Sequence, residues 1–505
     1  MKELAITLDT EKKQPLYEQI YEALREAILQ GRILQGEKLP STRFEAEYLQ
    51  VSRSTVELAY DQLVSEGYIH SEPYRGYFAC DVRELYDLTD IRTGEMKQKQ
   101  FRTENQQGTA EAEGLHGETG SSPQKQTSYE IDFSLNELSM DNFPYNGLSK
   151  IMKNLLLDHG KQIMSSGSAF GEKNLKETIC DYLYHARNVR CTPEQIIIGA
   201  GNEYLQLMLI QMLGTSHGVA MESPTYLRAY QTFKNAGLSV REVALDDAGM
   251  RVDLLRKTDA GIAYVMPSHQ FPLGIVMPMK RRLELLNWAV EEPERYIIED
   301  DYDSEFRYKG KPIPALQGID RSGRVIYLGT FSKSIASSIR VSYMVLPEHL
   351  LERYQECCGF YACTVPNLMQ QAICQFMQEG YFEKNLNRMR AIYKSKHDYM
   401  LAELKKYSWV REIMGENSGL HLLVEVDTDC SEQDVIEACA EQQIRVYGLS
   451  EYYISQNPKR EYPILLLGYG GLTEKQIADG LQMIDEVLAE LKKYQPISVH
   501  KELIQ

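Results

Sequence analysis

Two apolar segments of the chain, residues 296–298 and 325–328, are each followed by a group of polar side chains. Together these groups contain Asp300, Asp301, Tyr302, Thr330, Ser332, Lys333 and, slightly further on, Arg340. A pyridoxal phosphate site requires these residue types. A lysine forms a Schiff base, and an acid keeps the pyridine nitrogen protonated so that the ring withdraws electrons. Hydroxyls and an arginine neutralise the phosphate. The combination predicts a pyridoxal 5'-phosphate site with Lys333 as its attachment point.

The polar groups follow strands of one predicted sheet. From Tyr129 onward, helical patterns alternate with short apolar segments at residues 196–198, 219–221, 262–266, 296–298 and 325–328. Such segments predict an α/β fold with a mostly parallel sheet that helices cover on both faces. Open sheets of this kind bind ligands at the carboxyl ends of their strands. Beyond about residue 345, helical patterns and the apolar segments 420–426 and 464–467 predict a smaller C-terminal α+β lobe.

Length and composition limit the kinds of protein this chain can be. Its 505 residues suggest two to four domains, and its net charge of −17 argues against a basic nucleic-acid coat or a membrane-surface protein. That charge still allows a small DNA-reading module. Nine scattered cysteines favour a reducing cytosol, and Cys357, Cys358 and Cys363 lack a second cluster for a metal. The N-terminus has no signal-peptide pattern, and the apolar stretch 205–213 is too short to span a bilayer. We expect a cytoplasmic protein without metal or membrane partner.

The chain divides into three regions by composition. Residues 83–128 are rich in Gln, Glu, Lys, Gly and Ser and poor in large apolar residues, so we expect a flexible linker. A coil of roughly 45 residues spans about 35–40 Å, which is comparable to the spacing of DNA half-sites, about 34–36 Å. We call residues 1–82 the reader and residues 129–495 the effector domain.

The reader has the pattern of a small helical domain with a two-stranded wing. Residues spaced by four, from Leu16 to Ile28, give a first helix one apolar face. Thr42 and Glu45 predict a capping box at a second helix, and Ser52 predicts the N-cap of a third. A protein-interaction domain remains an alternative, because residues 1–80 hold nine Lys and Arg and thirteen Asp and Glu, a net charge of 9 − 13 = −4.

Three segments of the reader match the sequence pattern of a known family: Leu39–Arg43, Val51–Val56, and the pair Ala59-Tyr60 followed by Gly67. In this pattern the reader closely resembles the winged helix-turn-helix of the GntR family. The resemblance implies a double-stranded DNA operator as partner. The residues that would contact DNA are Arg43, Ser52, Arg53, Ser54, Thr55, Arg75 and Gly76.

The effector domain resembles fold-type I, class I aminotransferases, and the whole chain resembles the MocR/GabR branch of GntR regulators. The motifs that carry this are Pro267–Pro272, Ile298–Arg307 and Gly329–Lys333. The resemblance implies that Lys333 holds the cofactor as an internal aldimine. Asp300, rather than Asp301, would pair with the pyridine nitrogen, and Tyr302 would hydrogen-bond the ring hydroxyl.

The same resemblance assigns the rest of the cofactor site. Gly201 and Asn202 would offer backbone N–H groups to the phosphate at a helix N-terminus. The residues that would close around the phosphate are Thr330, Ser332 and Arg340. Tyr226 would stack on the ring, unless it is a core aromatic. His269 lies in the loop that passes the ring, where a purely structural role is equally open.

Two positions depart from the pattern of relatives. Glu203 stands where relatives commonly carry an uncharged amide, and its carboxylate would repel a phosphate unless it turned outward. Arg228 matches an arginine that grips a carboxylate in GABA-sensing relatives, but Glu451 stands where a second effector arginine falls. We therefore expect a neutral or cationic amine rather than GABA. The alternative is that Glu451 points to solvent and a cation at residues 459–460 substitutes.

The sequence predicts a pyridoxal phosphate-dependent transcriptional regulator. An amine or amino acid would displace Lys333, form an external aldimine and shift how the readers are presented to DNA. The resemblance implies a domain-swapped, head-to-tail homodimer in which each reader packs on the partner's effector domain. Two alternatives stay open. One is an active aminotransferase with a fused DNA-binding domain. The other is a regulator of vitamin B6 synthesis that senses pyridoxal phosphate itself.

Overall fold

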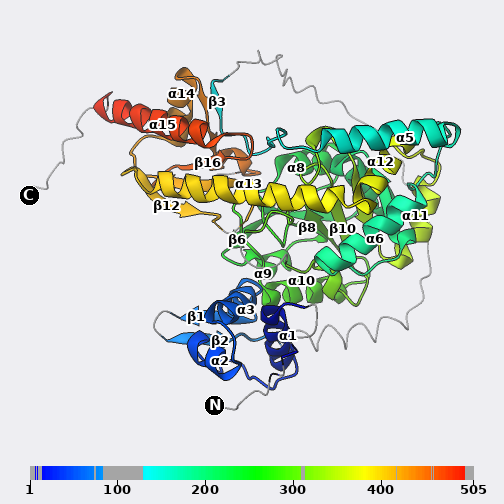
Figure 1. The fold of residues 1–505 in the computed structure, drawn as a ribbon, viewed down its shortest axis with the longest axis horizontal. Helices are drawn as coiled ribbons and strands as arrows, with labels where there is room; N and C mark the ends of the chain where they lie inside the picture. The colour runs from blue at the N-terminus through cyan, green and yellow to red at the C-terminus, as the bar shows by residue number, and fades with distance from the viewer. Residues whose placement is uncertain are drawn as a thin grey trace, which may run out of the picture.

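The computed structural model describes residues 6, 8–9, 14–72, 75–82, 129–308, 313–416, 418–455, 458 and 460–494. Within them the chain forms the reader, a large α/β unit and a smaller C-terminal lobe (Figure 1). The predicted linker, residues 83–128, lies outside the described residues. None of the helices described is long and apolar enough to cross a membrane.

The reader is a three-helix unit with a wing. Its elements are α1 (Leu16–Leu29), α2 (Thr42–Tyr48), α3 (Arg53–Ser65) and the antiparallel strands β1 (Ile69–Glu72) and β2 (Gly76–Ala79). The apolar side chains that repeat every four residues in α1 are buried, as predicted: Ile20, Leu24 and Ile28. The winged helix-turn-helix fold is therefore confirmed.

One predicted helix cap is confirmed and one is wrong. Ser52 caps α3, because its Oγ accepts a hydrogen bond from the backbone N–H of Thr55 at 3.1 Å. The capping box at Thr42 is wrong, since Ser41 caps α2 and accepts a hydrogen bond from the N–H of Phe44 at 3.2 Å. Ser41 has extended backbone angles, whereas Thr42 is already the first helical residue. A cap must have a non-helical backbone, which decides between the two hydroxyls.

An eight-stranded sheet forms the centre of the effector domain, in the order β4-β11-β10-β9-β8-β5-β6-β7. Its strands are β4 (Ile196–Gly199), β5 (Gly218–Ser223), β6 (Val240–Asp246), β7 (Gly249–Met250), β8 (Ala260–Val265), β9 (Tyr296–Asp301), β10 (Val325–Thr330) and β11 (Ser342–Val345). The pairs from β10 through to β6 are parallel, and β11 and β7 pair antiparallel with their neighbours. The predicted mostly parallel sheet is confirmed.

Helices cover both faces of this sheet. Ile297 of β9 packs in a cluster with α10 (Met279–Glu291), and its neighbour Ile298 packs in a cluster with α7 (Asn202–Leu213). The other covering helices are α5 (Tyr145–Ile163), α6 (Lys173–Arg187), α8 (Leu227–Asn235), α9 (Val252–Leu255), α11 (Leu351–Cys358) and α12 (Asn367–Gln378). Because side chains alternate along a strand, Asp300 lies on the α7 side and Asp301 on the opposite side.

The long helix α13 (Tyr381–Leu404) leads into the C-terminal lobe (Figure 1). The lobe contains a sheet of β12 (Val410–Met414), β13 (His421–Val426), β16 (Ile464–Gly468) and β15 (Tyr447–Gly448), with helices α14 (Glu432–Glu441) and α15 (Glu474–Tyr494). In addition, β14 (Ile444–Arg445) pairs in parallel with β3 (Ile131–Asp132), from the beginning of the effector domain. This pairing holds the residues that follow β3 close to the lobe.

The reader packs on the effector domain of its own chain, next to α9 and α10 (Figure 1). Leu63 and Tyr68 of the reader share one buried cluster with Met279 and Leu283 of α10. The N–H of Met279 also donates a hydrogen bond to the carbonyl oxygen of Glu66 at 2.7 Å. The sequence prediction placed the reader on a partner's effector domain, so the contact observed within one chain differs from it. An exchanged dimer would make the same contact between two chains.

Candidate functional site

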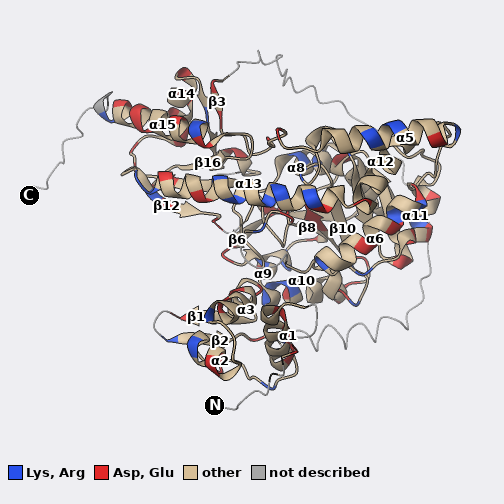
Figure 2. Cartoon of the chain, viewed as in Figure 1, with Lys and Arg blue, Asp and Glu red and all other residues tan. Residues whose placement is uncertain are grey.

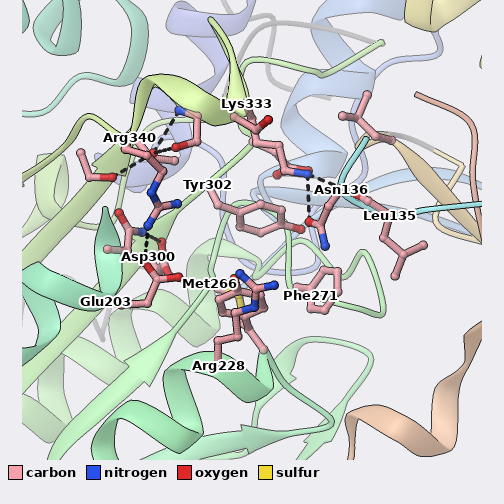
Figure 3. A pocket seen from close by; sticks show the side chains of 18 of the residues that line it. Leu135, Asn136, Glu203, Arg228, Met266, Phe271, Asp300, Tyr302, Lys333 and Arg340 are labelled. Carbon is pink, nitrogen blue, oxygen red and sulfur yellow. Dashed lines mark hydrogen bonds and ion pairs between the residues drawn. The ribbon is translucent and has the colours of Figure 1, made fainter. Parts of the chain in front are cut away.

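A cavity lies at the carboxyl ends of β9 and β10, where the sequence predicts the cofactor (Figure 3). It is lined by Leu135, Asn136, Asn202, Glu203, Tyr226, Arg228, Met266, Phe271, Asp300, Tyr302, Asp303, Thr330, Ser332, Lys333, Ser337, Arg340, Ser342, Leu420 and His421. These residues include most of the predicted site. Three predicted residues are not part of the lining: Gly201, His269 and Glu451.

Asp300 is buried at one wall of the cavity. Its Oδ1 accepts a hydrogen bond from Nδ2 of Asn202 at 2.9 Å, and its Oδ2 accepts one from the hydroxyl of Tyr264. Burial raises the pKa of the Asp300 carboxyl to about 7, with nearby Asp301 and Glu203 adding to the rise and the two hydrogen bonds opposing it. A buried carboxylate in this position is stabilised by a cationic N–H group, which a protonated pyridine nitrogen would supply.

Asp301 faces the other side of the sheet. It forms a buried ion pair with Arg187, 2.7 Å from Nε to Oδ2, and accepts a hydrogen bond from the Tyr327 hydroxyl at 2.6 Å. These contacts fix Asp301 away from the cavity. The assignment of Asp300 rather than Asp301 to the cofactor thus agrees with the position of both side chains.

Lys333 lies across the cavity from Asp300 (Figure 3). Its Nζ donates to the carbonyl oxygen of Leu135 at 3.2 Å and to Oδ1 of Asn136 at 3.1 Å. Burial lowers the pKa of the Lys333 ammonium to about 8, and the charge of Asp303 opposes the change. A lower pKa increases the fraction of neutral amine, which is the form that attacks a carbonyl carbon.

The other end of the cavity has the form of an anion cup. Gly201 has φ +102°, and a Cβ atom placed there would lie 2.2 Å from Nη2 of Arg340. The α7 helix begins at the next residue, Asn202, so its first N–H groups point toward the cup. Thr330 Oγ1 lies 3.0 Å from Ser332 Oγ and 2.9 Å from Ser342 Oγ. A glycine, a helix N-terminus, hydroxyls and an arginine in one place fit a phosphate group.

Glu203 occupies part of this cup. Its Oε2 accepts a hydrogen bond from Nη2 of Arg340 at 2.9 Å, and both side chains line the cavity (Figure 3). Glu203 therefore does not turn outward in the structure. The sequence analysis predicts that its carboxylate repels a bound phosphate unless it does so.

Hydrogen bonds connect the half-buried Tyr302 with the buried side chains of Asp303 and of His269, which lies in the neighbouring loop. Nδ1 of His269 lies 2.9 Å from Oδ2 of Asp303 and 2.9 Å from the hydroxyl of Tyr302. His269 thus acts on the cavity through Tyr302 and Asp303, both of which line it. This arrangement leaves His269 outside the cavity lining, which favours the structural role that the sequence left open.

Aromatic and histidine side chains form the apolar part of the wall. Tyr226 lines the cavity and makes an edge contact with Phe271, with ring centroids 5.9 Å apart. His421 reaches in from the C-terminal lobe, and its Nε2 lies 2.8 Å from the carbonyl oxygen of Pro272. Burial lowers the pKa of the His421 imidazole to about 4, with His269 adding to the fall. The ring is therefore neutral at pH 7.

Of the two predicted effector residues, Arg228 lines the cavity and Glu451 does not. Arg228 is exposed at the beginning of α8 and lines the cavity. Glu451 is exposed on the short helix η5 (Leu449–Tyr452), outside the lining. Of the two suggested substitutes, Arg460 donates a hydrogen bond to the Tyr453 hydroxyl at 3.1 Å, while residue 459 lies outside the described residues.

Most of the predicted DNA contacts are exposed, and two of them, Thr55 and Gly76, are half-buried. The contacts lie at the N-termini of α2 and α3 and at the turn between β1 and β2. Two of the arginines bind neighbouring acids: Arg53 Nε lies 2.7 Å from Oε1 of Glu57, and Arg75 forms an ion pair with Glu72. Basic and acidic residues are interspersed along the ribbon of the reader (Figure 2).

The sequence reasoning missed several residues of the site: Asn136, Tyr264, Asp303 and His421. Tyr264 lies in the apolar strand β8, where the sequence pattern indicates only a core residue. Asp303 lies inside a motif that the sequence had singled out. Asn136 and His421 come from distant segments and show no local signal. In the part of the chain that is described, no cluster of His, Cys, Asp and Glu could hold a metal ion.

The fold and the cavity together define a helix-turn-helix protein with an aminotransferase-like domain. Comparison with known families agrees. Residues 130–460 match the family "Aminotransferase class I and II", and residues 16–78 match "Bacterial regulatory proteins, gntR family". This chain belongs to the MocR/GabR-type regulators, in which these two domains are joined.

Individual relatives extend over the whole chain. The HTH-type transcriptional regulator YdeL of Bacillus subtilis is 37% identical over 472 residues, 93% of this chain and 96% of YdeL. The probable rhizopine catabolism regulatory protein MocR of Rhizobium meliloti is 29% identical over 494 residues, 96% of either chain. Among solved structures, the multiple substrate aminotransferase of Thermococcus profundus aligns with a TM-score of 0.64 and 26% identity, over 74% of this chain and 94% of that one.

Proposed function

We propose that this regulator holds pyridoxal 5'-phosphate on Lys333 and that a small amine or amino acid entering the cavity changes its affinity for DNA. The observation that carries the proposal is the placement of three groups around one cavity. Asp300 is buried at one wall, the Lys333 amine lies across from it, and the cup at Gly201 and Arg340 lies at one end.

Each group has a separate task in this proposal. Bound there, the cofactor would supply an aldehyde and an electron-withdrawing ring. Lys333 would hold it covalently, and Asp300 would keep a proton on the ring nitrogen. Asn202 and Tyr264 orient the Asp300 carboxylate by their hydrogen bonds. Asn136 and the carbonyl oxygen of Leu135 would hold the Lys333 amine once it is displaced.

A continuous segment supports coupling between the cavity and the reader. Met266 and Phe271 line the cavity, and twelve residues after Met266 the chain reaches Pro278 beside Gly67 of the reader. The buried Arg282 of α10 holds this segment, because Nη2 donates to the carbonyl oxygen of Pro267 at 3.0 Å and Nε to that of Met277 at 2.8 Å. A change in the cavity would thus reach the surface on which the reader packs.

We also propose that the functional form is a homodimer with exchanged readers, as the family resemblance implies. The surface of α10 that carries the reader in the structure would then carry the reader of the second subunit. Binding of the ligand would change the relative position of the two readers. That position would determine which spacing of DNA half-sites the dimer binds.

The test uses the purified full-length chain and the Lys333→Ala variant. We expect the wild type to develop visible absorbance on adding pyridoxal phosphate and to be labelled at Lys333 after borohydride reduction. We expect neither in the variant. Titration of candidate amines should then change both the absorbance and the anisotropy of a labelled operator DNA. Absence of labelling at Lys333 would refute the cofactor site.

The same samples test the alternatives. Repeated turnover with an amino donor and a keto acceptor, together with DNA binding that ignores the amine, would identify an active aminotransferase instead. DNA binding that changes on addition of pyridoxal phosphate alone, and not further with amines, would identify the cofactor as the signal.

A further inference from the structure

The contact between Glu203 and Arg340 is the unexpected feature of the anion cup. The two side chains are 2.9 Å apart and both line the cavity (Figure 3). A Cβ atom on Gly201 would lie 2.2 Å from the Arg340 guanidinium and 3.0 Å from the Glu203 carboxylate. The pair therefore lies directly over the N-terminus of α7, the place where a phosphate would bind.

The Glu203 carboxylate supplies a negative charge from the protein itself at the place where a phosphate would bind. Its carboxylate stands in the first turn of α7, where the helix dipole favours a negative charge. It also neutralises the arginine that the cup provides. Its charge is felt across the cavity, since it contributes to the raised pKa of the Asp300 carboxyl. A phosphate that enters must displace Glu203 from Arg340 and then remain close to a second negative charge.

The displacement is feasible because the pair is open to water. The side chain of Arg340 is 50% exposed to solvent, and that of Glu203 is 33% exposed. Ion pairs this exposed are weak, so Glu203 can rotate into solvent when a ligand competes. Repulsion between the carboxylate and a phosphate dianion remains after that rotation, because both stay near the same helix turn.

We propose that Glu203 competes with the cofactor phosphate for Arg340 and the α7 N-terminus, and so lowers the affinity of this chain for phosphorylated ligands. The proposal rests on the cofactor site described above. Glu203 is a specificity-determining residue in it: it penalises the phosphate far more than the ring, which its charge reaches only at a distance, through Asp300. Cofactor occupancy would then respond to the supply of pyridoxal phosphate instead of being permanently saturated.

The test compares Glu203→Gln with the wild type in the cofactor-free full chain. Intrinsic fluorescence is titrated with pyridoxal phosphate and, separately, with pyridoxal, which has the same ring and no phosphate. We expect Glu203→Gln to tighten the Kd for pyridoxal phosphate about tenfold, equivalent to about 1.4 kcal/mol, and to change the Kd for pyridoxal far less. In an Arg340→Ala background the gain should shrink.

A matched control is Glu352→Gln. Glu352 is also the second residue of an α-helix, α11, and does not line the cavity. This variant loses a comparable charge at a helix N-terminus and should bind pyridoxal phosphate like the wild type. Thermal unfolding of each variant verifies that it is folded.

The outcomes separate this inference from the proposed function. If the wild type binds pyridoxal phosphate and Glu203→Gln binds it equally or more weakly, Glu203 does not compete and only this inference fails. An equal gain for pyridoxal would also overturn it, because the effect would then not concern the phosphate. If neither protein binds pyridoxal phosphate, the cofactor site itself is refuted.

Discussion

Replacing Gly67 by alanine should release the reader from the effector domain. Gly67 has φ +74°, and a Cβ atom there would lie 2.5 Å from Cβ of Pro278 and 3.2 Å from the backbone N of Met279. Gly36 is a matched control in the same reader, because it has φ +70° and a Cβ atom would meet nothing within 4 Å. Left-handed backbone costs a non-glycine residue about 1–2 kcal/mol in either variant.

The difference between the two variants isolates the docking contact. Overpacking costs about 1–3 kcal/mol. Of the two variants, only Gly67→Ala is overpacked, and only while the reader is docked on the effector domain. An opening equilibrium shifted by that amount changes about 5- to 150-fold. The reporter is the Met279 N–H, which donates to Glu66 only while the reader is docked.

Hydrogen–deuterium exchange of peptides covering residues 276–284 measures this opening. We expect faster exchange at Met279 in Gly67→Ala than in Gly36→Ala, with similar exchange in the central strand β9 of both. Under the proposed function, the effect of an amine on the DNA affinity of the pyridoxal phosphate-loaded protein should persist in Gly36→Ala and be lost in Gly67→Ala. Equal exchange at Met279 in the two variants would refute the docked arrangement as the source of coupling.

Two further predictions concern pH and salt. The pKa of Asp300 is raised to about 7, so the folded cofactor-free chain binds more protons than the unfolded chain between about pH 4 and 7. Its stability should therefore fall as pH rises through this window, and denaturant titrations should show a smaller fall in Asp300→Asn; an identical pH profile would contradict the raised pKa. Arg53→Ala should weaken operator and random DNA alike and reduce the slope of log K against log salt by about one. Selective loss for one DNA sequence would show instead that Arg53 reads a base.

The parts of the site that are local in sequence could be predicted from it. Asp300 and Lys333 each follow an apolar strand, and the carboxyl ends of parallel strands meet at one edge of a sheet. Alternation along β9 predicts that Asp300 and Asp301 face opposite sides of the sheet. The family resemblance indicates which of the two faces the cofactor.

The remaining parts depend on contacts between distant segments. Asn136 reaches Lys333 because β3 pairs with β14, more than 300 residues further along the chain. His421 enters the cavity from a separate sheet. The packing of the reader on α10 depends on the fit of Gly67 against Pro278, which no periodicity reveals. Even the cap of α2 required the backbone angles of Ser41 and Thr42 to decide between two equivalent hydroxyls.

The charge of the reader explains why its presentation matters for regulation. Residues 1–80 carry a net charge of −4, and Arg53 and Arg75 are held by Glu57 and Glu72. A phosphate that contacts either arginine must replace a carboxylate, so each contact contributes less to affinity than a free cation would. A single reader would then bind DNA weakly, and in the proposed homodimer two readers would raise the affinity by binding two half-sites at once. Affinity that depends on the relative position of two readers can be controlled by the domain on which they pack, without any ligand near the DNA.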